Sequence, residues 1–150
     1  MESLSVPASG RIYLDASAFI YSIERHPVFG PLLDPMWAAL AASAAQIITS
    51  ELTVLESLVL PLRARDQKSL VIFERAFDES GLQLLPASRS VMRLAAELRA
   101  NHSSLRTPDA IHLATAEIYA AQFIVTNDAR MRDKTVVPIV ILSDLITSGS

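Results

Sequence analysis

Short apolar runs of strand length alternate with longer helical stretches, and this alternation constrains the fold more than any other feature of the sequence. The runs expected to form strands are 11–15, 46–49, 82–86, 123–126 and 136–142. The stretches expected to form helices are 17–24, 31–44, 51–62, 67–79, 88–101 and 108–121. Strands that alternate with helices favour βαβ units, with a mostly parallel sheet and helices on both faces. We therefore predict an α/β fold.

The length of the chain supports one domain, which we place at residues 11–145. Its 150 residues fit a domain of ordinary size, and 51% of them are hydrophobic, enough for a sizeable core. We expect residues 1–10 to form a flexible leader and residues 146–150 a short tail. No apolar stretch approaches the roughly 20 residues of a membrane span. The lack of cysteine suits a reducing compartment, so we expect a cytoplasmic protein without membrane contact.

Acidic residues stand where the carboxyl ends of the predicted strands meet. Asp15 ends the first strand, Asp128 follows the fourth, and Asp109 lies in the first turn of the last predicted helix. Glu56 lies in the helix after the second strand. Open parallel sheets bind ligands at this edge, so we expect the four side chains to converge there. Taken alone, Asp15 has an alternative role as a turn or cap residue. Asp109 likewise has one as a first-turn acid that favours the helix dipole.

Two glutamates compete for the position on the helix 51–62. Glu56 lies on an apolar stripe with i, i+3, i+4 spacing, whose other members are Leu52, Leu55, Val59 and Leu60. A carboxylate rarely points into such a stripe without a partner. Glu51 lies about 140° away around the helix and has an adequate role as a first-turn acid. Val54 and Leu58 make a second side of the helix apolar, so the stripe is not unique. We favour Glu56 over Glu51.

Converging carboxylates repel one another unless a cation lies between them. Oxygen ligands without cysteine suit Mg²⁺ or Mn²⁺ better than Zn²⁺. Such ions can deprotonate water, polarise a phosphate and stabilise a leaving oxygen. The predicted site therefore fits the hydrolysis of a phosphodiester.

Four segments contain or adjoin these acids, namely 13–20 (YLDASAFI), 49–56 (TSELTVLE), 108–116 (PDAIHLATA) and 126–128 (TND). In this order and at these separations, they resemble the PIN domain and specifically VapC-type toxin nucleases. The resemblance implies a three-layer α/β/α sandwich with strand order 3-2-1-4-5, a Mg²⁺ or Mn²⁺ cofactor and endoribonuclease activity on RNA. It also implies homodimers and a separate VapB-like antitoxin. Catalytic and metal-binding roles would fall on Asp15, Glu56, Asp109 and Asp128.

Several polar residues beside these acids have both a functional and a structural interpretation. Ser17 can orient Asp15 or hold a metal-bound water, or it can be only a helix N-cap. Thr126 and Asn127 can hydrogen-bond a neighbouring carboxylate, or they can be a polar strand end. His112 lies one turn after Asp109 and can contact phosphate or carry a proton. For His112 we favour a hydrogen-bonded core histidine.

The basic residues near the predicted site bear on nucleic-acid binding. The net charge is −3, so no global basic field attracts RNA, and any contact must come from local basic residues or bound metal. Arg130, Arg132 and Lys134 follow the last acid and can bind RNA phosphates without reading sequence. Asp133 lowers the net positive charge of this cluster. The alternative interpretation is that these residues belong to an ordinary solvated loop.

The helix predicted at 108–121 is apolar on two sides, whereas a surface helix needs only one apolar stripe. The second side, which includes Ile111, Ala114 and Ile118, must pack on other elements or on a second subunit. Apolar residues near the first helices could take an amphipathic helix from a partner, namely Phe19, Ile20, Ile23 and Trp37. A partner arginine could bind the acids directly.

Other enzyme classes fit the sequence less well. A Rossmann dinucleotide site needs a glycine-rich turn after the first strand, and residues 15–18 contain no glycine. A phosphatase of the haloacid dehalogenase type would have an aspartate at the position of Ser17. The remaining alternative is a non-catalytic PIN-like module that binds RNA or a protein partner. We expect a divalent-metal-dependent endoribonuclease, the toxin of a VapBC-type pair.

Overall fold

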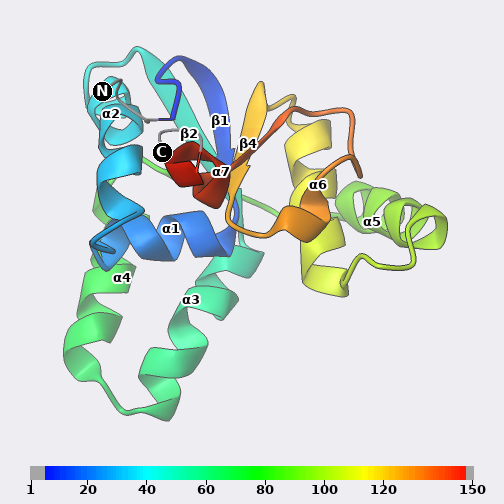
Figure 1. Ribbon diagram of the computed structural model, residues 1–150. Helices are drawn as coiled ribbons and strands as arrows, with labels where there is room; N and C mark the ends of the chain where they lie inside the picture. Colours follow the sequence, from blue (N-terminus) through cyan, green and yellow to red (C-terminus); the bar gives the residue numbers. More distant parts are fainter. Residues whose placement is uncertain (1–5, 148–150) are drawn as a thin grey trace.

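The computed structural model describes residues 6–147, and these form a parallel sheet between layers of helices (Figure 1). Within the described residues, five strands pair in the order β3-β2-β1-β4-β5, and every neighbouring pair is parallel. The strands are β1 (Gly10–Leu14), β2 (Ala45–Ser50), β3 (Gln83–Leu85), β4 (Phe123–Thr126) and β5 (Ile139–Ile141). The predicted α/β sandwich and strand order are confirmed.

The helices are divided between the two faces of the sheet. They are α1 (Ala16–Ile23), α2 (Gly30–Ala41), α3 (Leu52–Arg63), α4 (Gln67–Glu79), α5 (Arg89–Asn101), α6 (Thr107–Ile118) and the short α7 (Leu142–Thr147). The helices α5 and α6 lie on one side of the sheet, and α3 and α4 run side by side away from it (Figure 1). None of the helices in the described part of the chain is long and apolar enough to cross a bilayer.

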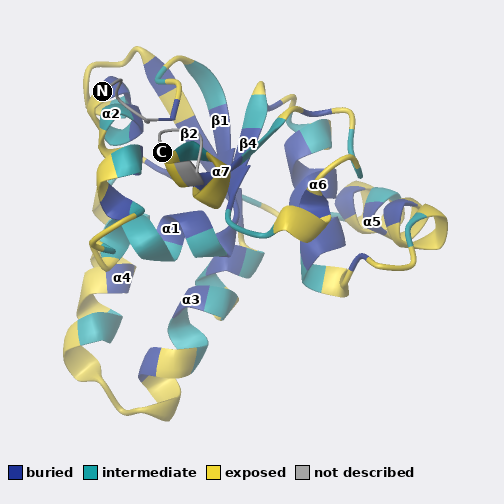
Figure 2. Cartoon of the chain, viewed as in Figure 1, coloured by how far each residue is buried: buried dark blue, intermediate teal, exposed yellow. Residues whose placement is uncertain are grey.

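The strands bury side chains on both faces, which explains their nearly continuous apolar sequences. Tyr13, Ile48 and Ile124 pack in one core with α5 and α6. Their strand neighbours, including Ile12 and Val125, pack in a second core with α1, α2 and α4. Figure 2 shows buried residues concentrated in the sheet and in α6. The sheet therefore holds the carboxyl ends of its central strands, β1 and β4, in a rigid frame.

Helix α6 is buried almost all round, from Asp109 through Thr115 and Ala116. The sheet covers one side and α5 covers the other, so Ile111 and Ala114 are buried within the chain. Of the second apolar side, Ile118 is exposed. The two-sided pattern is thus satisfied inside one chain and does not by itself require a second subunit.

The structure corrects several predicted boundaries. The fifth strand is confined to residues 139–141, since Val136 is exposed and Leu142 already begins α7. Helix α7 was not predicted, and it takes in residues 146–147 of the predicted tail. Helix α6 ends at Ile118, and Ala120 beyond it has a positive φ of 55°.

The predicted leader differs from the structure over residues 6–10. Val6 is buried, and its N–H donates a hydrogen bond to the carbonyl of Leu32 over 3.0 Å. Gly10 is the first residue of β1, with a φ of +77° that few residues other than glycine adopt. Residues 1–5 of the leader and 148–150 of the tail lie outside the described residues.

Candidate active site

Asp15 lies at the junction of β1 and α1, and its carboxylate is almost completely surrounded by donors. One oxygen, Oδ1, accepts from the Ala18 N–H over 3.0 Å and from the Ser17 hydroxyl over 2.7 Å. The other, Oδ2, accepts from the Thr126 hydroxyl over 2.5 Å. Asp15 itself is therefore the N-cap of α1, and the interpretation of Ser17 as that cap is wrong. Ser17 instead orients the Asp15 carboxylate.

Burial makes the charge of Asp15 costly. The residue is only 4% exposed, and this desolvation raises the pKa of its carboxyl. The positive charge that His112 carries when it is protonated, and the hydrogen bonds from Thr126, Ala18 and Ser17, oppose the rise without cancelling it. A buried carboxylate of this kind is stabilised by a cation beside it.

The end of β4 connects Asp15 with Asp128. The Thr126 hydroxyl donates to Asp15 and accepts from the Asp128 N–H over 3.0 Å. The Asn127 N–H donates to the Ser17 hydroxyl over 3.2 Å. The Asn127 side chain turns away from the acids, because its Oδ1 accepts from the Ser143 N–H. Thr126 thus hydrogen-bonds a neighbouring carboxylate, which is the functional interpretation of this residue. The Asn127 amide oxygen instead accepts a hydrogen bond at the start of α7.

Helices α3 and α6 bring Glu56 to His112. The Nε2 of His112 lies 2.7 Å from a Glu56 oxygen, and its Nδ1 lies 2.6 Å from the Tyr13 hydroxyl. A neutral imidazole that accepts from Tyr13 can donate its other proton to Glu56. His112 is buried, as expected of a core histidine, and its ring also reaches the wall of the cleft described below.

The structure separates Glu56, which lies in α3, from Glu51, which directly precedes the helix. Glu51 is exposed at the start of the helix, with its Oε2 3.4 Å from the Ala87 N–H. Glu56 lines the same cleft as Asp15. The fold therefore brings Glu56, and not Glu51, to the aspartates.

One cleft of about 350 Å³ gathers the four predicted acids. The residues that line it come from the start of α1, from α3, from α6 and from the loop after β4. They are Asp15, Ala16, Ser17, Tyr21, Glu56, Arg106, Asp109, His112, Asn127, Asp128, Arg130 and Met131. Asp109 is buried, and its Oδ2 accepts from the backbone N–H of Arg106 over 3.2 Å. All four acids expected at the strand ends therefore line the same cleft.

Two arginines hold the acids at the mouth of this cleft. Arg130 approaches both oxygens of Asp128, with its Nε at 3.0 Å and its Nη2 at 2.8 Å. This hydrogen-bonded pair lowers the pKa of Asp128 and raises that of Arg130. Arg106 bridges Asp109 and Asp128, with its Nη2 3.5 Å from an oxygen of each. Sequence reasoning missed Arg106, although its place three residues before Asp109 at a helix start was a usable signal.

The other two predicted phosphate contacts lie outside the lining of the cleft. Arg132 forms an ion pair with Asp144 over 2.9 Å, and the Lys134 Nζ lies 3.4 Å from the Arg132 carbonyl. Among the predicted basic residues, Arg130 alone lines the cleft within the described part of the chain.

The donor set of the cleft fits a hard divalent cation. Carboxylates and hydroxyls supply oxygen, the ligand that Mg²⁺ and Mn²⁺ prefer, and burial leaves Asp15 in need of a positive charge. Over residues 6–147, however, no three His, Asp or Glu side chains lie close enough together to bind an ion without moving. The guanidinium groups of Arg106 and Arg130 occupy the positions beside Asp109 and Asp128, so a cation would replace them there.

A sequence model of the PIN domain matches residues 12–136, most of the chain. The chain belongs to the PIN domain family. All four acids of the cleft lie within the matched residues of this PIN domain. No match was found among curated proteins.

Solved structures share the fold of this PIN domain at low sequence identity. VapBC2 from Rickettsia felis, bound to a promoter DNA fragment, has a TM-score of 0.70 at 16% identity, over 87% of this chain and 98% of that one. FitAcB from Neisseria gonorrhoeae has a TM-score of 0.64 at 21% identity, over 88% and 98%. VapC20 from Mycobacterium tuberculosis, described as a sarcin-ricin loop cleaving toxin, has a TM-score of 0.62 at 16% identity, over 75% and 86%.

Proposed function

We propose that the protein is a divalent-metal-dependent endoribonuclease. The observation that carries this proposal is the convergence of four carboxylates in one cleft of a PIN domain. Asp15, Glu56, Asp109 and Asp128 would hold Mg²⁺ or Mn²⁺. When bound, such an ion supplies an activated water and neutralises charge on the phosphate.

The neighbouring residues would keep these ligands in place. Ser17 and Thr126 each donate a hydrogen bond to Asp15, and so fix the carboxylate at the carboxyl end of β1. His112 holds Glu56 toward the cleft, and Tyr13 in turn fixes the imidazole. Partners of this kind orient metal ligands and tune their affinity.

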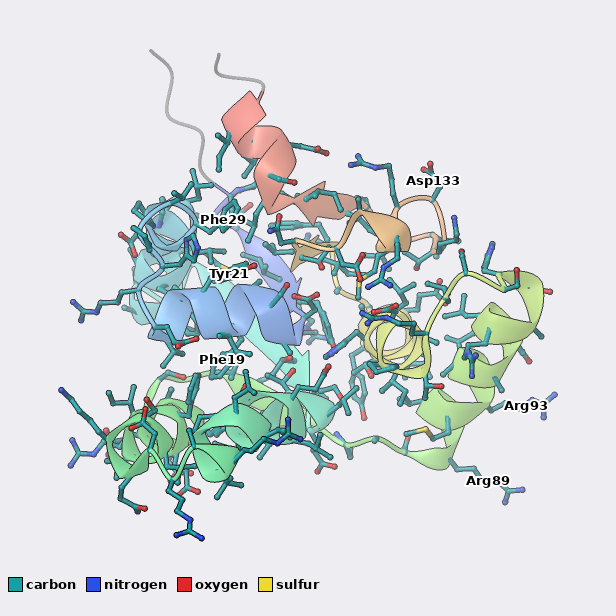
Figure 3. The ribbon with its side chains drawn as sticks, turned by 60° about the horizontal axis from the view of Figure 1, so that its bottom comes forward. Phe19, Tyr21, Phe29, Arg89, Arg93 and Asp133 are labelled. Atoms are coloured by element: carbon teal, nitrogen blue, oxygen red, sulfur yellow. The ribbon has the colours of Figure 1, made fainter. Side chains whose placement is uncertain are left out.

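The experiment compares two aspartate-to-asparagine variants in an RNA cleavage assay with Mn²⁺ or Mg²⁺. Asp15→Asn keeps the shape of the side chain but removes its charge, and we expect metal-dependent cleavage to fall by orders of magnitude. The control is Asp133→Asn, because Asp133 is exposed on a loop away from the cleft (Figure 3). Its φ of 62° suits asparagine. Near-normal cleavage by Asp15→Asn would refute the site.

The alternative is a non-catalytic module that binds RNA or a protein. The specific observation in its favour is that Arg106 and Arg130 already hold two of the acids. RNA binding by the wild-type protein, with no cleavage in Mg²⁺, Mn²⁺ or EDTA, would support this alternative.

We further propose that the protein is the cytoplasmic toxin of a VapBC-type pair. The similarity to VapBC2 and VapC20 supports a VapB-like antitoxin and an RNA substrate. Ile23 and Trp37 line a cavity of about 500 Å³ beside α1 and α2 that could take part of a partner helix. Phe19 does not contribute to it, because its ring is buried against Phe77.

Co-expression with a neighbouring small reading frame should give a complex that no longer cleaves RNA. Failure to form such a complex would leave a stand-alone nuclease.

A further inference from the structure

Arg106 has a firmly held backbone and a loosely held side chain. Its N–H donates to Asp109, and its carbonyl accepts from the Ala110 N–H over 3.0 Å. Arg99 braces the same turn, since its Nε donates to the Leu105 carbonyl and its Nη1 to the Thr107 hydroxyl. The side chain of Arg106 is 59% exposed at the mouth of the cleft.

The side-chain contacts of Arg106 are long and divided. Its atoms lie 3.3 to 3.5 Å from oxygens of Asp109 and Asp128, which belong to different elements. Arg130, in contrast, forms a bidentate pair with Asp128 at 2.8 and 3.0 Å. Arg106 is therefore the cation that the acids can release more easily.

The charges of the cleft set up an exchange. Four carboxylates and two guanidinium groups line the cleft. A divalent ion carries two positive charges, as many as the two arginines together. Asp109 and Asp128 would hold such an ion in place of Arg106. Because the backbone of Arg106 is braced, the released side chain would remain attached close to the mouth of the cleft.

We propose that Arg106 binds a backbone phosphate of the RNA once a divalent ion has replaced it at the acids. This inference rests on the proposed function, and it adds a substrate-binding residue to the cleft. The planar guanidinium matches two phosphate oxygens at once. Arg130 lies beside it on the neighbouring element, so the mouth presents a basic edge to a strand whose scissile phosphate enters between the acids. Such contacts position RNA without reading its sequence.

The experiment uses Arg106→Ala, Arg106→Lys and, as control, Arg93→Ala. Arg93 is exposed on α5, where its side chain extends away from the molecule (Figure 3). Binding of a labelled single-stranded RNA is measured by fluorescence anisotropy in Ca²⁺, a cation that takes the same oxygen ligands. Cleavage is measured in Mn²⁺, and Mn²⁺ affinity is measured by calorimetry without RNA.

We expect Arg106→Ala to weaken RNA binding and raise KM about tenfold, with a smaller change in kcat. The slope of log affinity against log salt should become shallower by about 0.7, the value for one phosphate contact on a single strand. Arg106→Lys should restore the salt slope, because it restores the charge, and Arg93→Ala should behave as wild type. Mn²⁺ affinity should stay the same or rise in Arg106→Ala, since a competing cation is gone.

Two results would overturn the inference while leaving the nuclease assignment intact. One is unchanged KM and salt slope in Arg106→Ala. The other is a joint loss of RNA and Mn²⁺ affinity, which would make Arg106 a structural support for Asp109. A wild-type protein that binds RNA through Arg106 without cleaving it would refute the proposed nuclease function and keep the inference. A wild-type protein that neither binds nor cleaves RNA would overturn both the inference about Arg106 and the proposed nuclease function.

Discussion

At the residue scale, Asp15 and Asp128 have opposite electrostatic environments although they line the same cleft. Asp15 is buried, and desolvation raises the pKa of its carboxyl. Asp128 is held by Arg130, whose hydrogen bonds lower the pKa of that carboxyl. The first charge opposes folding and the second favours it. The two residues therefore predict opposite dependences of stability on pH.

We expect Asp15→Asn to be more stable than wild type at neutral pH in EDTA. Because the folded-state pKa of Asp15 is raised, its ionised form destabilises the fold near neutrality. The penalty is full above that raised pKa, shrinks as the pH falls through it and disappears below the unfolded-state pKa. Urea unfolding across acid and neutral pH should show the gain shrinking as the pH falls. A gain that grows toward acid pH would contradict the raised pKa.

Asp128→Asn is the matched comparison for this series. The folded-state pKa of Asp128 is lowered, so its charge contributes stability above the unfolded-state pKa and loses it as the pH falls through the folded one. The variant should be less stable than wild type near neutral pH, with the difference closing in acid. Equal behaviour of the two asparagine variants would refute this account.

Glu56 in α3 and Glu51 directly before it provide a second residue-scale prediction. Glu56→Gln should abolish metal-dependent cleavage, because Glu56 lines the cleft. Glu51→Gln should cleave normally and lose at most roughly 0.3–1 kcal/mol of stability from the helix end. Cleavage assays and urea unfolding on both variants test this. The reverse ranking would move the ligand to Glu51.

The position of Glu56 was predicted for a reason that the structure corrects. Its supposed apolar stripe includes Leu55 and Leu60, which are 61% and 69% exposed. The buried side of α3 instead consists of Thr53, Ser57 and Pro61. Sequence patterns identified the acids because strand ends are easy to locate. They could not show which face of α3 packs inward, or that Arg106 reaches the acids, because both depend on tertiary contacts.

At the element scale, α6 is the most deeply buried helix of the described chain, and it carries two of the polar residues that line the cleft. Asp109 and His112 face the cleft, and Leu113 is fully buried in the core shared by the sheet, α5 and α6. Pro108 near its start removes a backbone donor that the first helical turn does not need. The packing of α6 therefore fixes the two polar side chains relative to β1.

We expect Leu113→Ala to lower the free energy of unfolding by about 2–5 kcal/mol, because it removes buried methyl groups and leaves a cavity. Leu62→Ala is the control, since Leu62 is exposed on α3 and its loss should cost less than about 0.5 kcal/mol. Urea unfolding measures both. Equal losses would show that α6 is not anchored by this core.

Elements that follow plain periodicity were predictable, whereas the C-terminal end was not. The segment 136–142 has the apolar sequence of one strand, yet only Ile139–Ile141 pairs with β4. Pro138 lacks an N–H to donate to the sheet, and Leu142 turns into α7 to reach the core on the α1 side. The choice between strand and helix for such a short run depends on packing that the sequence does not display.

At the scale of the whole molecule, we propose that the protein forms a homodimer, which would cover some of its exposed apolar side chains. Leu55 and Leu60 project from α3, and Val136 is 89% exposed on the loop before β5. Light scattering at tens of micromolar protein should give a mass of about 33 kDa, twice the 16.3 kDa of one chain. A mass of 16.3 kDa would contradict the dimer.

The strand order has a consequence for the timing of protein synthesis. The central strand β1 pairs with β2 early in the chain, but its other neighbour, β4, begins at Phe123. While the residues from Phe123 onward are still inside the ribosome, β1 lacks this second neighbour and Asp15 lacks its hydrogen bond from Thr126. If the proposed activity is correct, the cleft becomes competent only after β4 and Asp128 have left the ribosome. Until then the growing chain would leave the messenger and the ribosome that make it uncut.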